Sequence, residues 1–191
     1  MGKKIYVIQG HPDSTSFSYE LADAYVRGAG GEGDELKRVN LAELDFELSV
    51  PNPSGADMEP DLVKCQEDVL WAEHIVLVYP IWWGSMSALL KGFLDRVFIQ
   101  GFAYSLRPDS QLWEKLLNGR SARAIMTMDG PVWHNHLMYG KPAEKMVQKS
   151  VLEFCGIHPV HLTNIGPVDE MTEHQKELWL QKMESAGSDR N

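Results

Sequence analysis

The chain has 191 residues, of which 43% are hydrophobic and 24% are charged, so it can bury the core of one domain and lies outside the composition range of disordered, fibrous and membrane proteins. Its 27 acidic and 18 basic residues give a formal net charge of −9, which argues against nonspecific binding of nucleic acid or anionic membranes. We therefore expect a single domain over residues 1–191 whose partners are small molecules or other proteins.

The first residues and the two cysteines bear on the cellular compartment. The apolar run from Ile5 to Ile8 is too short for the hydrophobic region of a signal peptide, and no run approaches the roughly 20 residues that cross a bilayer. Cys65 and Cys155 lie far apart, each in a predicted helix. We therefore expect both to be buried without a chemical role, and we expect neither a disulfide nor a metal site. The sequence predicts a cytoplasmic protein without a membrane span.

Short apolar runs alternate with amphipathic segments along the chain, which is typical of a parallel sheet covered by helices. The predicted strands are Lys4–Gln9, Glu35–Asn40, His74–Tyr79, Arg123–Met128 and Val160–Ile165. The predicted helices lie around Leu21–Val26, from a cap at Asp61 to Leu70, and over Met86–Ile99, Pro142–Cys155 and Thr172–Met183, the last with a capping box from Thr172 to Gln175. This order predicts an α/β flavodoxin-like three-layer sandwich with a five-stranded parallel sheet of order 2-1-3-4-5.

Three segments fall outside this alternation. Leu41–Glu59 contains prolines among acidic and small residues and should be irregular, Gln111–Leu117 is a short amphipathic piece, and the polar tail Ser185–Asn191 should fray. None of the three interrupts the predicted single domain.

The loop after the first strand offers hydroxyl groups at Ser14, Thr15, Ser16 and Ser18 together with free backbone amides where a helix starts. Unpaired N–H groups and the helix dipole both favour a phosphate at such a junction. The loop has neither the Gly-Lys-Ser/Thr of a Walker loop nor the Gly-x-Gly-x-x-Gly dinucleotide pattern. Capping of the helix by Ser14 or Ser16 is the alternative interpretation.

A second candidate stretch follows the third strand. The apolar run His74–Tyr79 stops at Pro80, two adjacent tryptophans and Gly84 follow, and the next helix should open at Ser85 or Ser87. This junction lies at the carboxyl edge of the sheet, where open α/β sheets bind their ligands. The flat tryptophan side chains suggest a flat ligand, and the turn after the fourth strand would form the opposite wall of its pocket. The candidates are Trp82, Trp83, Gly84, Thr127, Met128, Asp129 and Gly130. Core packing or a protein interface is the alternative for the tryptophan pair, although Pro80 and Gly84 favour a loop.

Other side chains allow more than one interpretation. One helix has a wide apolar face that fits either a core helix or a subunit contact, and we expect a symmetric dimer. The face consists of Leu89, Leu90, Phe93, Leu94 and Val97.

Three histidines, His11, His134 and His136, lie near the predicted site. A lone histidine in a loop more often has no functional role. The sequence shows no carboxylate pair, Cys-x₅-Arg loop or Ser-His-Asp order, so it gives little support to hydrolysis or metal chemistry.

Three stretches together resemble a known family: Gly10–Ser18, then Tyr79–Gly84 with Lys91–Phe98, and Phe102–Tyr104. They are similar to the NAD(P)H:quinone oxidoreductase family of flavodoxin-like fold, which includes vertebrate quinone reductases, bacterial drug-activity modulators and ancillary oxidoreductases of potassium-efflux systems. The resemblance covers nearly the whole chain, from the first loop to Phe154–Gly156.

The resemblance implies a homodimer with a flavin in each site at the dimer interface. It assigns the phosphate end to His11, Ser16, Phe17 and Ser18, the isoalloxazine wall to Pro80, Ile81, Trp82 and Trp83, and the rest of the pocket to Thr127, Met128, Asp129 and Gly130. Tyr104 would reach the partner's substrate cavity. The resemblance favours FAD, but no motif marks an adenosine site, so FMN stays open.

One departure from the family concerns the proton relay. The vertebrate enzymes have a Thr-Thr-Gly-Gly type of sequence where this chain has Thr127–Gly130, and their relay tyrosine and histidine have no secure counterparts here. Trp133, His134 and Tyr139 are therefore the candidates for shaping the catalytic site.

The activity implied by the resemblance is a ping-pong transfer of two electrons from NAD(P)H to a quinone or similar acceptor, with the flavin doing the chemistry that the protein orients. Backbone amides near Trp83 and Gly130 would stabilise negative charge on the reduced ring. Two other functions stay open: a regulatory subunit that reports redox state to a membrane transporter, and a flavodoxin-type one-electron carrier.

Overall fold

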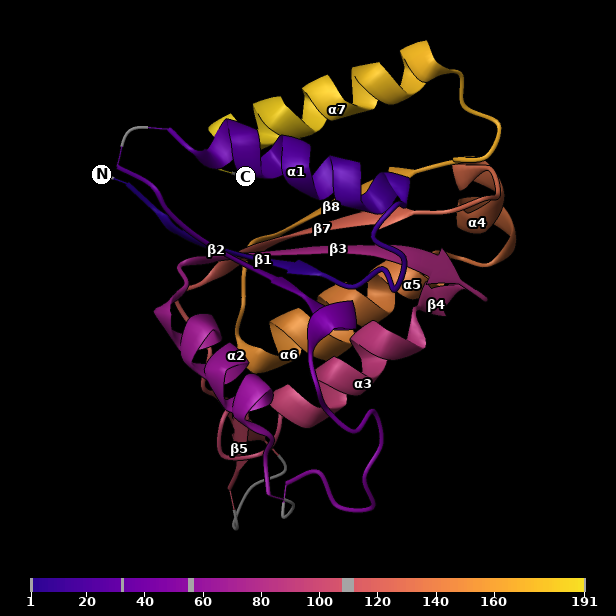
Figure 1. Cartoon of the computed structure of the whole chain (residues 1–191). Helices are drawn as coiled ribbons and strands as arrows, with labels where there is room; N and C mark the ends of the chain where they lie inside the picture. The colour runs from indigo at the N-terminus through magenta and orange to yellow at the C-terminus, as the bar shows by residue number, and fades with distance from the viewer. Residues whose placement is uncertain (1, 32, 55–56, 108–111, 191) are drawn as a thin grey trace.

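Five parallel strands form the middle layer of the molecule (Figure 1). The computed structural model describes residues 2–31, 33–54, 57–107 and 112–190. The strands are β1 (Lys4–Gln9), β2 (Glu35–Asn40), β3 (His74–Trp82), β7 (Ser121–Thr127) and β8 (Val160–Ile165). They pair in parallel in the order β2-β1-β3-β7-β8. The predicted fold class and strand order are confirmed.

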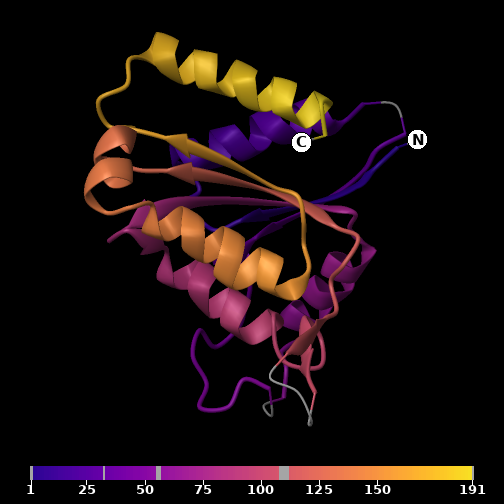
Figure 2. The same cartoon turned by 180° about the vertical axis from the view of Figure 1, so that it is seen from behind.

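Helices cover both faces of the sheet. Helices α1 (Phe17–Ala29) and α7 (Glu173–Ser188) lie on one face, and α2 (Pro60–Trp71) and α3 (Ala88–Val97) lie on the other (Figures 1 and 2). Beside α3 runs one continuous helical segment that consists of α5 (Pro142–Lys145), a π-helical stretch η2 (Met146–Leu152) and α6 (Glu153–Cys155). This segment confirms the predicted helix Pro142–Cys155, and it ends at Gly156, whose φ of 101° favours glycine.

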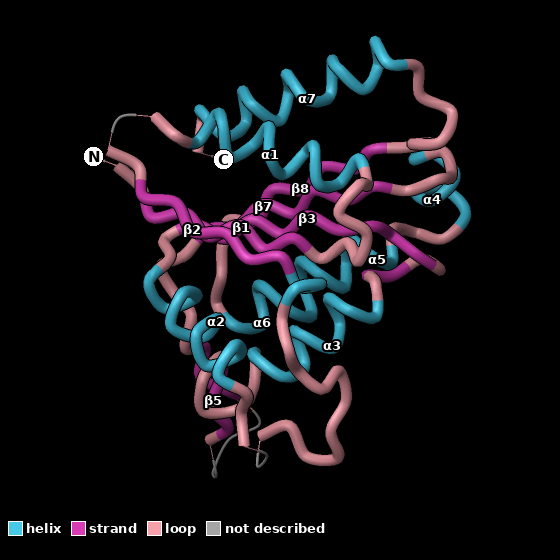
Figure 3. The backbone as a smooth tube through the Cα atoms, in the orientation of Figure 1, coloured by secondary structure: helices cyan, strands magenta, loops and turns pink. Residues whose placement is uncertain are grey.

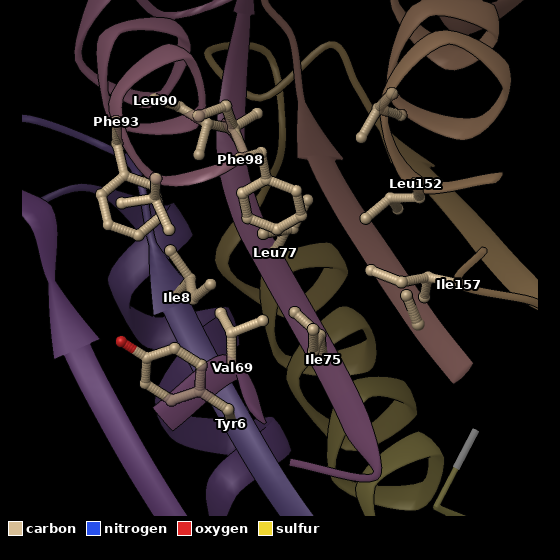
Figure 4. Packing of buried hydrophobic residues seen from close by; sticks show 14 of the residues in the cluster. Tyr6, Ile8, Val69, Ile75, Leu77, Leu90, Phe93, Phe98, Leu152 and Ile157 are labelled. Carbon is tan, nitrogen blue, oxygen red and sulfur yellow. The ribbon is translucent and has the colours of Figure 1, made fainter. Parts of the chain in front are cut away.

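Apolar side chains fill the space on both sides of the sheet because successive residues of a strand point to opposite faces. Ile5, Val7, Val76 and Val78 pack toward α1 and α7. Figure 4 shows the cluster on the other face, where side chains of the sheet meet those of the helices: Tyr6, Ile8, Ile75, Leu77, Val69, Leu90, Phe93 and Leu152. The predicted apolar face of α3 is thus buried in this chain's own core, and the predicted subunit contact stays a prediction.

The third strand differs from the prediction, which ended it at Tyr79. Strand β3 continues through Pro80 to Trp82 and turns back into β4 (Ser85–Met86), with which it pairs antiparallel. Pro80 is tolerated because it lies opposite Thr127 in the last pair between β3 and β7. Its missing N–H therefore interrupts no later hydrogen bond between these two strands. The tryptophan pair therefore ends a hairpin and does not lie in an open loop.

Two of the predicted helix caps are confirmed, and one is wrong. Ser87 caps α3, as predicted: its Oγ accepts the N–H of Leu90 at 3.3 Å. The capping box of α7 between Thr172 and Gln175 is present. The predicted cap at Asp61 is wrong, because Pro60 opens α2, and the Asp61 carboxylate instead accepts the N–H of Asp45. A proline suits the first helical position, since its missing N–H would have had no helical partner.

The remaining segments lie around the periphery. After a short 3₁₀ turn, η1 (Leu41–Glu43), the described part of the chain up to Glu59 is irregular, as predicted. Strands β5 (Tyr104–Leu106) and β6 (Trp113–Lys115) form a small antiparallel ribbon. Half of the described part of the amphipathic piece Gln111–Leu117 is therefore extended, and Gln111 itself lies outside the described residues.

The carboxyl-terminal tail is ordered by specific contacts. Helix α7 continues to Ser188, and the Arg190 guanidinium pairs with the Asp34 carboxylate at 2.8 Å. The Ser188 hydroxyl also donates to the Gly28 carbonyl at 3.1 Å. The prediction that the tail frays is therefore wrong for residues 185–190, and Asn191 lies outside the described residues.

Cys65 and Cys155 are buried and free, as predicted, and burial raises the pKa of the Cys155 thiol to about 12. Among the described helices, none combines the length and apolarity that a membrane crossing needs.

Candidate functional site

Two adjoining cavities lie where β1, β3 and β7 end. The loops that leave these strands gather at the same edge of the sheet, opposite the chain termini (Figure 3), because parallel strands share their direction. Helix α4 (Val132–Met138) follows β7 at this edge. Ile81 and Met128 line both cavities, so the two share a wall.

The smaller cavity, of about 220 Å³, brings together ten of the twelve predicted cofactor residues. These are His11, Ser16, Phe17, Ser18, Pro80, Ile81, Trp82, Thr127, Met128 and Asp129. Asp13, Val168 and Asp169 complete the lining. Val168 and Asp169 were not among the residues predicted from the sequence, although their position after the fifth strand at the same edge was a signal for them.

Polar groups at the start of α1 are left available in the smaller cavity. Ser16 occupies the position that precedes the helix, but its hydroxyl makes no capping bond, and Oγ is buried without a hydrogen-bond partner. Ser18 Oγ lies 2.8 Å from Thr127 Oγ1 and ties α1 to β7. The capping interpretation of Ser16 is therefore wrong, and its hydroxyl and the first amides of α1 fit an anionic group.

His11 is held in one orientation by its own loop. Its Nδ1 accepts the N–H of Asp13 at 3.0 Å, so in the neutral ring Nε2 carries the proton. The ring also packs edge-on against Trp82, with centroids 5.6 Å apart. Burial lowers the pKa of His11, and the neighbouring Asp13 opposes this effect. His11 thus presents an N–H donor near neutral pH.

The Asp13 carboxylate shapes the same loop. It accepts both the N–H and the hydroxyl of Thr15, each at 2.8 Å. These hydrogen bonds lower the pKa of Asp13, because they favour its charged form. The Thr15 hydroxyl is therefore engaged within the loop, whereas the Ser16 hydroxyl is not.

The larger cavity has a volume of about 490 Å³ and a different character. It contains the two remaining predicted cofactor residues, Trp83 and Gly130, and two of the predicted catalytic residues, His134 and Tyr139. The rest of its lining is Ile81, Gly84, Met128, Pro131, Asn135 and Pro142. Asn135 and Pro142 carried no signal in the sequence, because their place depends on how α4 and α5 pack.

The third predicted catalytic residue, Trp133, does not line either cavity. Its side chain is largely exposed, and its ring packs edge-on against His134 with centroids 5.6 Å apart. Tyr139 contacts the same His134 ring at 5.4 Å. The structure therefore brings the three side chains together around His134, with Trp133 on the outer side.

The two tryptophans of the hairpin contribute to different cavities. Trp82 lines the smaller cavity and Trp83 the larger one, and their exposed fractions are 41% and 104%. Core packing is thus wrong for both. Trp83 also has a φ of 53°, which is rare for a bulky residue and costs of the order of 1 kcal/mol or more.

The predicted substrate residue Tyr104 lies in β5, away from both cavities. Its ring packs edge-on against Phe154, with centroids 5.1 Å apart. Its predicted role requires a second chain and stays a prediction. Within the described residues, no group of three or more His, Cys, Asp or Glu side chains is arranged to hold a metal ion.

A family model with the description "flavodoxin-like fold" matches residues 3–186 of the chain. The chain belongs to this flavodoxin-like family. One relative in sequence, named an uncharacterized NAD(P)H oxidoreductase from Haemophilus influenzae, is 27% identical over 190 residues, which cover 94% of this chain and 93% of the relative.

Solved structures of similar shape extend over the whole flavodoxin-like chain. The NAD(P)H:quinone oxidoreductase from Methanothermobacter marburgensis has a TM-score of 0.81 and 22% identity and covers 99% of this chain and 97% of its own. An FMN-dependent NADH-azoreductase from Bacillus anthracis, in complex with FMN, has a TM-score of 0.75 and 16% identity and covers 99% of each chain. The resemblance of the sequence to NAD(P)H:quinone oxidoreductases of flavodoxin-like fold is confirmed.

Proposed function

We propose that the chain is a flavin-dependent NAD(P)H oxidoreductase that passes two electrons, in a ping-pong cycle, to a quinone or similar flat acceptor. The observation that carries the proposal is the pairing of two cavities along one wall: one offers unpaired donors to an anion, and the other offers flat apolar side chains. The family relatives named as NAD(P)H oxidoreductases and quinone reductases support this activity. The FMN complex of the azoreductase supports a flavin.

In this proposal, the smaller cavity holds the phosphate end of the flavin. Ser16 Oγ, the first amides of α1 and the Nε2 proton of His11 are the donors available there. We favour FAD on the family resemblance, and FMN remains the alternative because the donors described recognise a phosphate and not an adenosine.

The larger cavity would hold the flat ring system and the reacting partner. When bound, the flavin supplies the hydride chemistry, and the protein orients it. Trp83, Ile81 and Met128 offer apolar surface to a flat ring, and the backbone amides near Trp83 and Gly130 would favour negative charge on it. His134 and Tyr139 would shape the place of the acceptor, with Trp133 supporting the His134 ring.

The test is the absorbance spectrum of the purified full chain, followed by mass analysis of any cofactor released. We expect a yellow protein whose flavin absorbance is bleached directly by NADH or NADPH and restored by a quinone. A colourless chain that takes up neither FAD nor FMN would overturn the proposal. A stable blue semiquinone on photoreduction would instead favour the one-electron carrier.

The homodimer, the cytoplasmic location and a membrane-transporter partner remain predictions of the resemblance and of the sequence. Size-exclusion chromatography with light scattering tests the dimer. Copurification with a transporter tests the regulatory role.

A further inference from the structure

A buried carboxylate next to the larger cavity joins three elements. Glu144 lies in the first turn of α5 and is 4% exposed. Its Oε1 accepts hydrogen bonds from Asn164 of β8 at 2.6 Å and from His136 of α4 at 3.0 Å. Both of its oxygens accept from Nδ2 of Asn135, at 3.1 and 3.3 Å. The position of α4 therefore depends on this carboxylate.

The contact also decides which end of the Asn135 amide faces the carboxylate. A carboxylate can only accept, so it selects the NH₂ group and turns Oδ1 away. Asn135 is 7% exposed and lines the larger cavity, and the hydrogen bonds of its side chain to other described residues all run through Nδ2. The polar atom that Asn135 can offer to the cavity is therefore an acceptor.

We propose that Asn135 is a specificity-determining residue whose Oδ1 accepts an N–H from a flat ligand in the larger cavity, and that Glu144 is the positioning residue that fixes this amide. The inference rests on the proposed function, because it assumes a flat ring in that cavity. It specifies the ligand chemistry as a heteroaromatic ring with a lactam or carboxamide N–H. A flavin and a nicotinamide both carry such a group, whereas an oxidised quinone carries only acceptors.

Two pairs of probes separate the two sources of the N–H. Titration of the full chain with FMN and with N3-methyl-FMN tests the flavin, since the second probe lacks the lactam donor. The KM for NADH and for its reduced 3-acetylpyridine analogue tests the nicotinamide, since the analogue lacks the amide donor. In the wild type we expect a preference of about 3- to 10-fold for the donor-bearing member of one pair, the value of one hydrogen bond.

Variants then assign that preference to residues. Asn135→Leu keeps the size but removes the acceptor and should bring the ratio close to one. Glu144→Gln should reduce the ratio, because a glutamine amide allows the Asn135 amide to turn over. The matched control is Glu153→Gln at the far end of the same helical segment, where the carboxylate pairs with Lys149. This control should keep the wild-type ratio.

Equal binding of both members of both pairs by the wild type would overturn the inference and leave the proposed function standing. A wild-type ratio retained in Asn135→Leu would overturn it too. If Asn135→Leu does not fold, an unchanged ratio in Glu144→Gln has the same meaning. A full chain that binds neither FMN nor FAD would overturn the proposed function together with the inference.

Discussion

The two cavities are built in different ways, although they share Ile81 and Met128. The donors of the smaller one come from residues 11–18: the His11 ring, the Ser16 hydroxyl and the first amides of α1. The larger one depends on α4, which Glu144 ties to α5 and β8 through side chains. The donors for an anionic group thus come from one short stretch of sequence, whereas the wall of the ring site depends on side-chain contacts among α4, α5 and β8.

The largest expected effect comes from a negative charge in the smaller cavity. Ser16→Asp should weaken FMN binding by about 2–3 kcal/mol, or roughly 30- to 150-fold, because it replaces a donor to the phosphate by a repelling carboxylate. Helix α1 should tolerate the change, since aspartate is a favourable residue before a helix. Titration with FMN and with riboflavin measures the effect.

Riboflavin lacks the phosphate, so its affinity should be nearly the same in Ser16→Asp and in the wild type. Ser14→Asp, at an exposed position of the same loop, is the matched control and should leave FMN affinity within a few-fold of wild type. An equal loss for FMN and riboflavin would show that the smaller cavity does not recognise the phosphate.

Removal of the carboxylate behind the larger cavity should mainly change stability. Glu144→Ala removes the acceptor of the buried Asn135 amide and of the half-buried His136 and Asn164 side chains, and it should lower the free energy of unfolding by about 2–3 kcal/mol. Urea unfolding followed by circular dichroism measures the change.

Glu153→Ala is the control for this substitution. Its exposed lysine partner can return to water, so the loss should be under about 1 kcal/mol. Similar losses for both variants would mean that the Glu144 cluster contributes no more than a surface pair.

The tip of the hairpin should trade stability for ligand affinity. Trp83→Gly removes a side chain that buries nothing and relieves a φ of 53°, so the free energy of unfolding should rise by about 0.5–1 kcal/mol. Flavin affinity should fall by roughly 5- to 10-fold, since about 1 kcal/mol of aromatic contact is lost. Unchanged flavin affinity would remove Trp83 from the ring site.

The smallest expected effect is a pH dependence in the smaller cavity. The pKa of His11 is lowered by burial, so the ring is neutral at pH 7 and becomes charged only as the pH falls below its ordinary range. A bound pyrophosphate favours the charged ring, and FAD affinity should therefore rise as the pH falls from 7 to 5, by about 2- to 5-fold. His11→Asn should lose this rise, whereas a rise of the same size in that variant would exclude His11 as its source.

The sequence predicted the fold and the smaller cavity because both follow from local patterns. Apolar runs identify strands buried on both faces, and parallel strands bring the loops after Gln9, Tyr79 and Thr127 to one edge. The hairpin was missed because a proline usually ends a strand, and nothing local shows that β3 would continue past Pro80 to pair with β4. The Asn135–Glu144 contact was also missed, because it depends on the packing of a short helix that no periodicity reveals.

One contact sets the distance between the two parts of the site. The Ser87 hydroxyl caps α3, just after the hairpin, and also donates to the carbonyl of Gly10 at 2.8 Å. A Cβ atom at Gly10 would lie 3.1 Å from Cβ of Leu90, so the first loop is packed closely against α3. The first loop and the hairpin are thereby held at a fixed separation. We expect the site to select ligands by the length of the spacer between the anionic group and the flat ring.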